Sequence, residues 1–136
     1  MRDEQTPTRR RTTLEQALAA ARSRIGRLEP AEARLAQAQG ALLVDTRCAD
    51  DRRRRGSISG AATFPLSVLP WRLDPDSPYR DPELARLDRL IVLLCADGFS
   101  SSLAAAQLVD LGFEDVADVI GGLSAWCAAG LPVEGI

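Results

Sequence analysis

Four short, mostly apolar runs are the strongest pattern in the chain. They occupy residues 41–44, 61–64, 91–94 and 116–120. A continuous apolar run of this length that ends in polar residues is typical of a strand buried on both faces of a parallel sheet. Helices are predicted over 101–111, where Gly112 follows, and over 123–129. Strands that alternate with helices predict an α/β fold with a central, mainly parallel sheet flanked by helices.

The chain before the first run has helical spacing. Thr13 followed by Gln16 matches a capping box and predicts a helix from Leu14 to Ile25 that stops near Gly26. Pro30 suits the first turn of a second helix over 31–38. The first residues are polar and hold too little apolar surface to offset the cost of ordering. The chain therefore divides into a flexible tail at 1–12, an N-terminal helical extension at 13–39 and one domain at 40–136.

Two polar segments follow the first strand. Leu69 to Pro82 contains four prolines and Trp71, which predicts an irregular surface connection. Arg52 to Arg55 resemble a basic contact patch, but the stronger prediction for them is a solvated loop face.

Length and charge narrow the function classes. The 136 residues leave room for one domain and a short appendage. Residues 1–40 hold eight arginines and five acidic residues, whereas residues 41–136 hold nine and fourteen, so the folded part is acidic and no nucleic-acid partner is expected. There is no apolar leader, and the longest apolar run has six residues, so we expect a cytoplasmic protein without a membrane span.

Histidine is absent, which excludes Ser-His and Cys-His catalysis and His-bearing zinc sites. Three cysteines, Cys48, Cys95 and Cys127, are widely spaced and favour a reducing compartment over a disulfide framework. We expect neither a metal nor an organic cofactor.

Cys95 is the candidate nucleophile. It ends the most apolar run and is followed by a short loop and a helix that starts near Ser101. A loop that enters a helix points its N–H groups at one spot, where they and the helix dipole would favour a solvent-accessible thiolate. Gly98 would let the loop curl around the sulfur. The structural alternative is a small apolar cysteine in the core.

Several ordered segments resemble the rhodanese-like domain family, and in detail its small, single-domain bacterial members. The resemblance covers about Pro30 to Val133. It is carried by LVDTR at 43–47, GSISGA at 56–61, PL at 65–66, VLPWRLDP at 68–75, IVLLC at 91–95, SSSLAAA at 100–106, GGLSAW at 121–126 and AGLPV at 129–133.

The resemblance implies a sulfurtransferase. Cys95 would take sulfane sulfur from a small donor such as thiosulfate, a polysulfide or a persulfide, hold it as a persulfide, and pass it to a thiol or to cyanide. By position, the active-site loop comprises Ala96, Asp97, Gly98, Phe99, Ser100 and Ser101. Phe99 would shape the mouth of the pocket.

The loop sequence differs from that of many active members of the family. Many members place arginine directly after the cysteine and at the end of the loop, where this chain has Ala96 and Ser100. Asp97 adds a negative charge that opposes thiolate formation and thiosulfate binding. We therefore predict weak activity with thiosulfate, unless Arg47 or one of Arg52 to Arg55 reaches the pocket.

Alternatives to sulfur transfer remain open. A rhodanese-fold binding or regulatory module with little turnover would fit the missing arginines. A phosphatase is disfavoured, because the anion-gripping arginine of such loops would stand where this chain has Ser101. Asp45 and Arg47 are predicted either to line the rim of the pocket or to form a structural salt bridge. Cys48 or Cys127 could resolve a persulfide on Cys95, although nothing in their spacing establishes proximity. The sequence leaves open the oligomeric state and the role of the N-terminal helices.

Overall fold

The structure is a computed structural model that describes residues 10–135 of the chain. Within these residues the strands are β1 (Gly26–Leu28), β2 (Leu42–Asp45), β3 (Ala62–Thr63), β4 (Ile91–Leu94) and β5 (Val116–Val119). The helices are α1 (Leu14–Arg22), α2 (Pro30–Ala38), α3 (Ala49–Arg55), α4 (Leu69–Leu73), α5 (Ser100–Asp110) and α6 (Gly122–Ala128). Most of the predicted tail lies outside the described residues.

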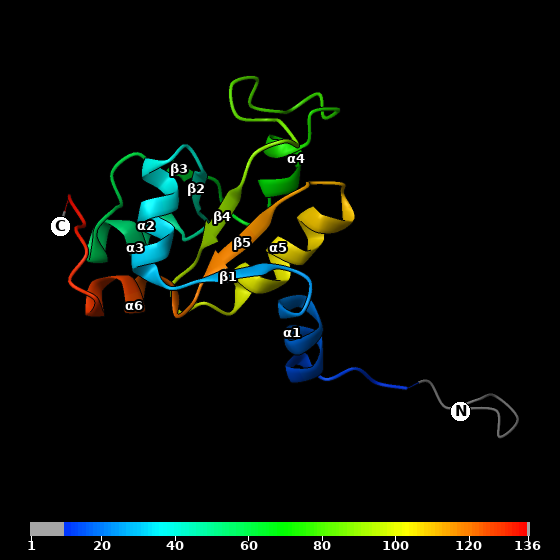
Figure 1. Cartoon of the computed structure of the whole chain (residues 1–136), viewed down its shortest axis with the longest axis horizontal. Helices are drawn as coiled ribbons and strands as arrows, with labels where there is room; N and C mark the ends of the chain where they lie inside the picture. The colour runs from blue at the N-terminus through cyan, green and yellow to red at the C-terminus, as the bar shows by residue number, and fades with distance from the viewer. Residues whose placement is uncertain (1–9, 136) are drawn as a thin grey trace, which may run out of the picture.

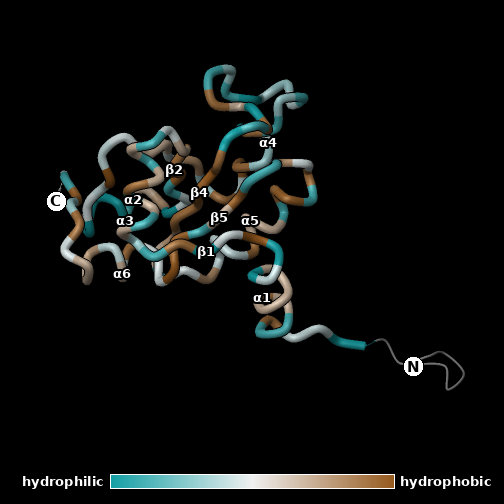
Figure 2. The backbone as a smooth tube through the Cα atoms, in the orientation of Figure 1, coloured by the Kyte–Doolittle hydropathy of each residue, from teal (hydrophilic) through white to brown (hydrophobic). Residues whose placement is uncertain are grey.

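The strands form one parallel sheet in the order β1-β5-β4-β2-β3 (Figure 1). Side chains alternate along β4, so Ile91 and Leu93 pack on one face and Val92 and Leu94 on the other. The first face is covered by α4 and α5, and the second by α2 and α6. Figure 2 shows the apolar colouring along β4 in the middle of the molecule. The predicted α/β fold is therefore confirmed.

The predicted helix from Leu14 to Ile25 is too long. The capping box at Thr13 forms, but α1 ends at Arg22. Residues 26–28 then form β1, which pairs with β5 at the edge of the sheet. Pairing decides the conformation of this short segment, because without β1 the buried strand β5 would have unpaired backbone groups on one side. A Cβ at Gly26 would lie 3.0 Å from the Cβ of Ala117, so glycine allows the close approach.

The predicted irregular connection from Leu69 to Pro82 begins with a helix, α4. Leu69 and Leu73 are almost fully buried and lie one helical turn apart, so they anchor this helix in the core. Pro70 does not prevent the helix because it stands in the first turn, where its missing N–H costs nothing. The rest of the segment, residues 74–82, is irregular as expected.

Arg52 to Arg55 lie in helix α3 rather than in a loop. Asp50 and Asp51 stand in the first turn of this helix and the arginines in its last turn. This order of charges complements the helix dipole at both ends. Among the described residues, no helix has both the length and the apolar character that crossing a membrane requires.

Candidate active site

Cys95 follows β4 directly, and its loop leads into α5. The residue is 5% exposed, so it lies deeper than the open position expected from the sequence. Its Sγ accepts a hydrogen bond from the Gly98 N–H at 3.1 Å and lies 3.3 Å from Ser101 Oγ. An amide and a hydroxyl therefore converge on the sulfur at the carboxyl end of the strand.

These contacts lower the pKa of the Cys95 thiol. Burial raises the pKa of Cys95, but hydrogen bonds from the hydroxyls of Ser101 and Ser100 and from the N–H groups of Ser101 and Gly98 outweigh it. The pKa of Cys95 therefore lies below that of an ordinary cysteine. Peptide and hydroxyl dipoles favour the thiolate without an imidazole.

Two glycines of the α6 entrance hold the loop in place. A Cβ on Gly98 would lie 2.6 Å from the Gly121 nitrogen, and a Cβ on Gly122 would lie 2.8 Å from the Gly98 nitrogen. Gly98 has φ +84°, which glycine adopts without strain. The Leu123 N–H also donates to the carbonyl of Cys95 at 2.9 Å. The loop thus keeps its shape because α6 packs against it without intervening side chains.

The side chain of Asp97 is directed to α6. Its Oδ1 accepts a hydrogen bond of 2.6 Å from Ser124 Oγ, which in turn accepts one of 2.8 Å from Arg55 Nη2. The sequence predicted that Asp97 would oppose the thiolate and that an arginine from 52–55 could reach the site. The structure brings Arg55 to Asp97 through Ser124, so part of the charge of Asp97 is balanced.

The remaining loop residues differ in exposure. Phe99 is 61% exposed, and Ala96 and Ser100 are half-buried. Ser101 is fully buried. Phe99 is thus the large side chain that the loop presents to solvent.

Asp45 and Arg47 form a buried ion pair after β2. Arg47 Nη2 lies 2.8 Å from Asp45 Oδ2, and both side chains are 1% exposed. The guanidinium also donates to the Gly56 carbonyl at 2.8 Å and to Asp51 Oδ2 at 3.0 Å. The Arg47 guanidinium is therefore held between β2 and α3. Of the two roles predicted from the sequence, a structural salt bridge or a place at the pocket rim, the contacts match the salt bridge.

Asp118 on β5 is a component of the site that sequence reasoning missed. Its carboxylate is fully buried and accepts hydrogen bonds from Ser101 Oγ at 2.9 Å and Ser102 Oγ at 2.6 Å. Arg27 of β1 pairs with it at 2.9 Å. Since Ser101 also contacts the Cys95 sulfur, a buried charge lies two hydrogen bonds from that sulfur. The available signal was an acidic residue inside an otherwise apolar strand.

Arg22, the last residue of α1, is the second missed component. Its Nη2 donates to the Gly98 carbonyl at 2.9 Å and its Nε to Ser102 Oγ at 3.1 Å. The guanidinium carbon lies 5.8 Å from the centroid of the Phe99 ring. No local pattern marks this residue, because its partners lie more than seventy positions away in the sequence.

The other two cysteines lie outside these contacts. Cys48 precedes α3 and Cys127 lies in α6, and both are exposed free thiols. Within residues 10–135 neither forms a disulfide with Cys95, and their suggested resolving role stays a hypothesis. Residues 10–135 bring no three His, Cys, Asp or Glu side chains together as a metal site would require.

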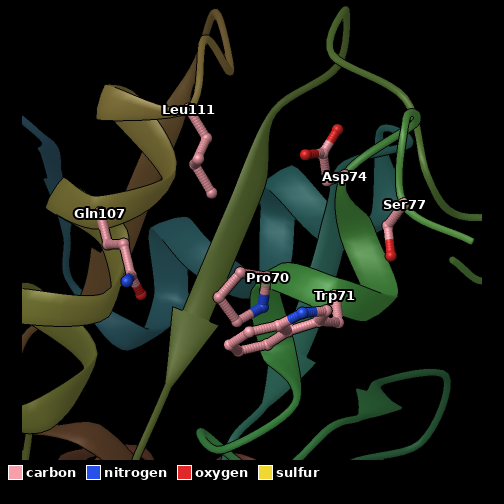
Figure 3. A pocket seen from close by; sticks show the side chains of 6 residues that line it. All are labelled: Pro70, Trp71, Asp74, Ser77, Gln107 and Leu111. Carbon is pink, nitrogen blue, oxygen red and sulfur yellow. The ribbon is translucent and has the colours of Figure 1, made fainter. Parts of the chain in front are cut away.

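A surface cavity of about 280 Å³ lies away from the sulfur (Figure 3). Pro70 and Trp71 of α4 face Gln107 of α5 across it. A neighbouring hollow shares Gln107 with this cavity and is also lined by Ser100. The neighbouring hollow therefore adjoins the end of the loop, and Cys95 lines neither of the two.

Comparisons with known proteins identify the family of the chain. A family model described as the rhodanese-like domain matches residues 29–129. Thiosulfate sulfurtransferase GlpE from Haemophilus influenzae (strain PittEE) is 36% identical over 96 residues, which cover 71% of this chain and 82% of that protein. A sulfurtransferase from Allochromatium vinosum is 33% identical over 100 residues, which cover 74% of this chain and 84% of that protein.

Solved structures show the same architecture. A protein of unknown function from Rhodopseudomonas palustris, described as a possible tyrosine phosphatase, has a TM-score of 0.83 and 33% identity, and the match covers 95% of this chain and 99% of that one. A rhodanese-related protein from Thermoplasma volcanium has a TM-score of 0.64 and 23% identity over 82% of this chain and 99% of that one. The second likeness concerns the fold alone.

Proposed function

Because the chain belongs to the rhodanese-like domain family, we propose that it is a sulfurtransferase in which Cys95 carries the sulfur. The relatives named as sulfurtransferases support the activity. The contacts of Gly98 and Ser101 with the Cys95 sulfur support the choice of residue, and they are the observation that carries the proposal.

The first half-reaction loads the cysteine. The Cys95 thiolate attacks the outer sulfur of a donor such as thiosulfate and forms an S–S bond. The bond between the two donor sulfurs breaks, and its electron pair leaves with sulfite. The product is a Cys95 persulfide whose terminal sulfur bears the negative charge. The N–H and hydroxyl groups of the loop stabilise this anion as they stabilise the thiolate.

The second half-reaction returns the enzyme to its starting state. Cyanide or a thiolate acceptor attacks the terminal sulfur of the persulfide, and the S–S bond to Cys95 breaks. The electron pair returns to the Cys95 sulfur, while thiocyanate or the acceptor persulfide leaves. Each step moves one neutral sulfur atom, from the donor to Cys95 and then from Cys95 to the acceptor, so the cycle balances without an external oxidant or reductant.

The loop favours a donor that does not require an oxyanion site. Ala96 and Ser100 offer no guanidinium for an oxyanion, and Asp97 stays exposed beside them. A persulfide or short polysulfide needs no oxyanion fork. We expect faster loading from these donors than from thiosulfate, and weak transfer from thiosulfate to cyanide.

Two other functions make different predictions. A binding module on this fold would leave Cys95 unmodified by every donor. A phosphatase would need an arginine to hold phosphate at the end of the loop, where Ser101 contacts the sulfur instead. The possible phosphatase description of the Rhodopseudomonas palustris protein therefore finds no support in this loop.

Mass spectrometry of the intact chain tests the proposal. The protein is incubated separately with thiosulfate, polysulfide and cysteine persulfide, and peptide mapping locates any added sulfur. We expect one added sulfur atom on Cys95 with at least one donor and none in Cys95→Ser, whereas Cys127→Ser should load normally. A chain that stays unmodified at Cys95 with all three donors would favour the binding module.

A further inference from the structure

The family match begins at residue 29, yet α1 and β1 precede it, and α1 contacts the loop through Arg22. α1 packs against α5, the helix that the loop enters. From the end of α1, Arg22 reaches the Gly98 carbonyl and Ser102, and it lies over the Phe99 ring. A segment outside the matched region thus supplies a cation to the outer side of the Cys95 loop.

The two polar groups of Gly98 are held from opposite sides. Its N–H donates to the Cys95 sulfur at 3.1 Å, and its carbonyl accepts from Arg22 at 2.9 Å. A glycine adopts alternative backbone conformations at little cost, so its neighbours must hold its carbonyl in one direction. If this carbonyl turned inward, it would present its negative end to an anionic sulfur. The charge-assisted bond from Arg22 favours the outward direction.

Arg22 also adds a positive charge where the loop has none of its own. Between Ala96 and Ser101 the one charged side chain is Asp97, which is negative. A cation near the loop favours the anionic form of the sulfur. Its position over Phe99 restrains the exposed ring at the mouth of the site.

We propose that Arg22 is a positioning residue of the sulfur-carrying site: it holds the Gly98 carbonyl outward so that the loop amides face the Cys95 sulfur. This inference rests on the proposed role of Cys95. It means that α1 supplies a residue that positions the Cys95 loop. It also assigns a role to the N-terminal helix, which the sequence left open.

The test compares three variants in the full chain, on a Cys48→Ser, Cys127→Ser background that leaves one thiol. Arg22→Gln removes the charge, and Arg22→Lys keeps the charge but loses the two-point guanidinium contact. Arg24→Gln is the matched control, because Arg24 follows the same helix but pairs with exposed Asp110. Near the site the other charged groups are Asp97, Asp118 on β5, Arg27 on β1 and Arg55 on α3, and all variants retain them.

Two readouts are needed. The first is the pH dependence of alkylation of Cys95 by iodoacetamide, and the second is the rate of persulfide formation from polysulfide. Arg22→Gln should move the alkylation midpoint to higher pH and slow loading about tenfold, a factor that corresponds to about 1.4 kcal/mol. Arg22→Lys should lie between Arg22→Gln and the parent chain. Arg24→Gln should match the parent chain in both.

The outcomes separate the two proposals. Parental values in Arg22→Gln would overturn the role of Arg22 while leaving Cys95 as the sulfur carrier. If the parent chain forms no persulfide, the proposed function fails, but the alkylation midpoint still decides whether Arg22 shapes the loop. Should thermal unfolding show that Arg22→Gln does not fold, Arg22→Lys decides: an intermediate midpoint supports the role and a parental midpoint overturns it.

Discussion

Replacing Asp118 by asparagine removes a buried negative charge two hydrogen bonds away from the Cys95 sulfur. In the present arrangement the carboxylate accepts the Ser101 hydroxyl proton, so that hydroxyl is less available to the sulfur. Asparagine keeps an acceptor oxygen of similar size but carries no charge. The substitution thus removes a nearby negative charge and loosens the hold on the Ser101 hydroxyl. Both effects favour the thiolate, so we expect Asp118→Asn to lower the pKa of Cys95 further.

The magnitude follows from the distances. Ser101 Oγ lies 3.3 Å from the Cys95 sulfur and 2.9 Å from Asp118 Oδ2, so the sulfur and the carboxylate are no more than about 6 Å apart. Two like charges at about 6 Å repel by about 3 kcal/mol at an effective dielectric constant of about 20. The ion pair with Arg27 cancels part of this repulsion. An effect of about 1.4 kcal/mol, or about tenfold in the thiolate population, is therefore expected.

The same substitution should weaken the fold. Arg27 loses the carboxylate of its ion pair, and its side chain is 23% exposed, so water replaces that partner only in part. Losing a hydrogen bond to a charged group costs about 1.5–3 kcal/mol. Asp118→Asn should therefore combine a more reactive sulfur with a lower free energy of unfolding.

The assay is alkylation of Cys95 at a pH below its midpoint, together with urea unfolding. Asp115→Asn is the control, because Asp115 is exposed, immediately precedes β5, and carries the same charge. Asp118→Asn should react about tenfold faster than wild type, and Asp115→Asn at the wild-type rate. A folded Asp118→Asn that reacts at or below the wild-type rate would refute the electrostatic reasoning.

Three further predictions concern single residues. Arg47→Met should lower the free energy of unfolding by about 3–5 kcal/mol in urea titrations, because it leaves the buried carboxylate of Asp45 without its partner; a loss below about 1 kcal/mol would contradict the structural role of this pair. Gly98→Ala should move the alkylation midpoint of Cys95 to higher pH, because the added methyl would lie 2.6 Å from the Gly121 nitrogen and displace the N–H that contacts the sulfur; an unchanged midpoint in a folded variant would count against the cradle. Asp97→Arg should raise thiosulfate:cyanide turnover by supplying a guanidinium to the loop, and a fast wild-type enzyme that this change leaves unaffected would show that the charge of Asp97 does not limit the donor.

The main elements of the fold could be predicted from local pattern. The apolar runs that became β2, β4 and β5 are buried on both faces, so their composition alone marks them as strands. β1 could not be found in this way, because a three-residue edge strand is defined by the partner it pairs with. α4 was missed because the four prolines between Leu69 and Pro82 argued against a helix, although Leu69 and Leu73 stand at helical spacing.

The candidate site also has one part that local sequence predicts and another that depends on the tertiary structure. Cys95 and the loop after it are consecutive in sequence, so the contact between Cys95 and Gly98 could be predicted from local pattern. Arg22 and Asp118 come from other elements, and only the assembled sheet and helices bring them to the loop. The exposure of the sulfur was overestimated, because the strand tip suggested an open position while packing of α6 against the loop covers it.

Discharge of a loaded chain tests the central claim most directly. The protein, on the Cys48→Ser, Cys127→Ser background that leaves Cys95 as its one thiol, is first loaded with polysulfide, freed of excess donor, and then mixed with cyanide while thiocyanate and the intact mass are followed. The account predicts that one thiocyanate forms for each persulfide lost from Cys95, that the mass returns to that of the unmodified chain, and that Cys95→Ser releases none. Thiocyanate that forms equally from Cys95→Ser, or a persulfide on Cys95 that cyanide cannot remove, would contradict it.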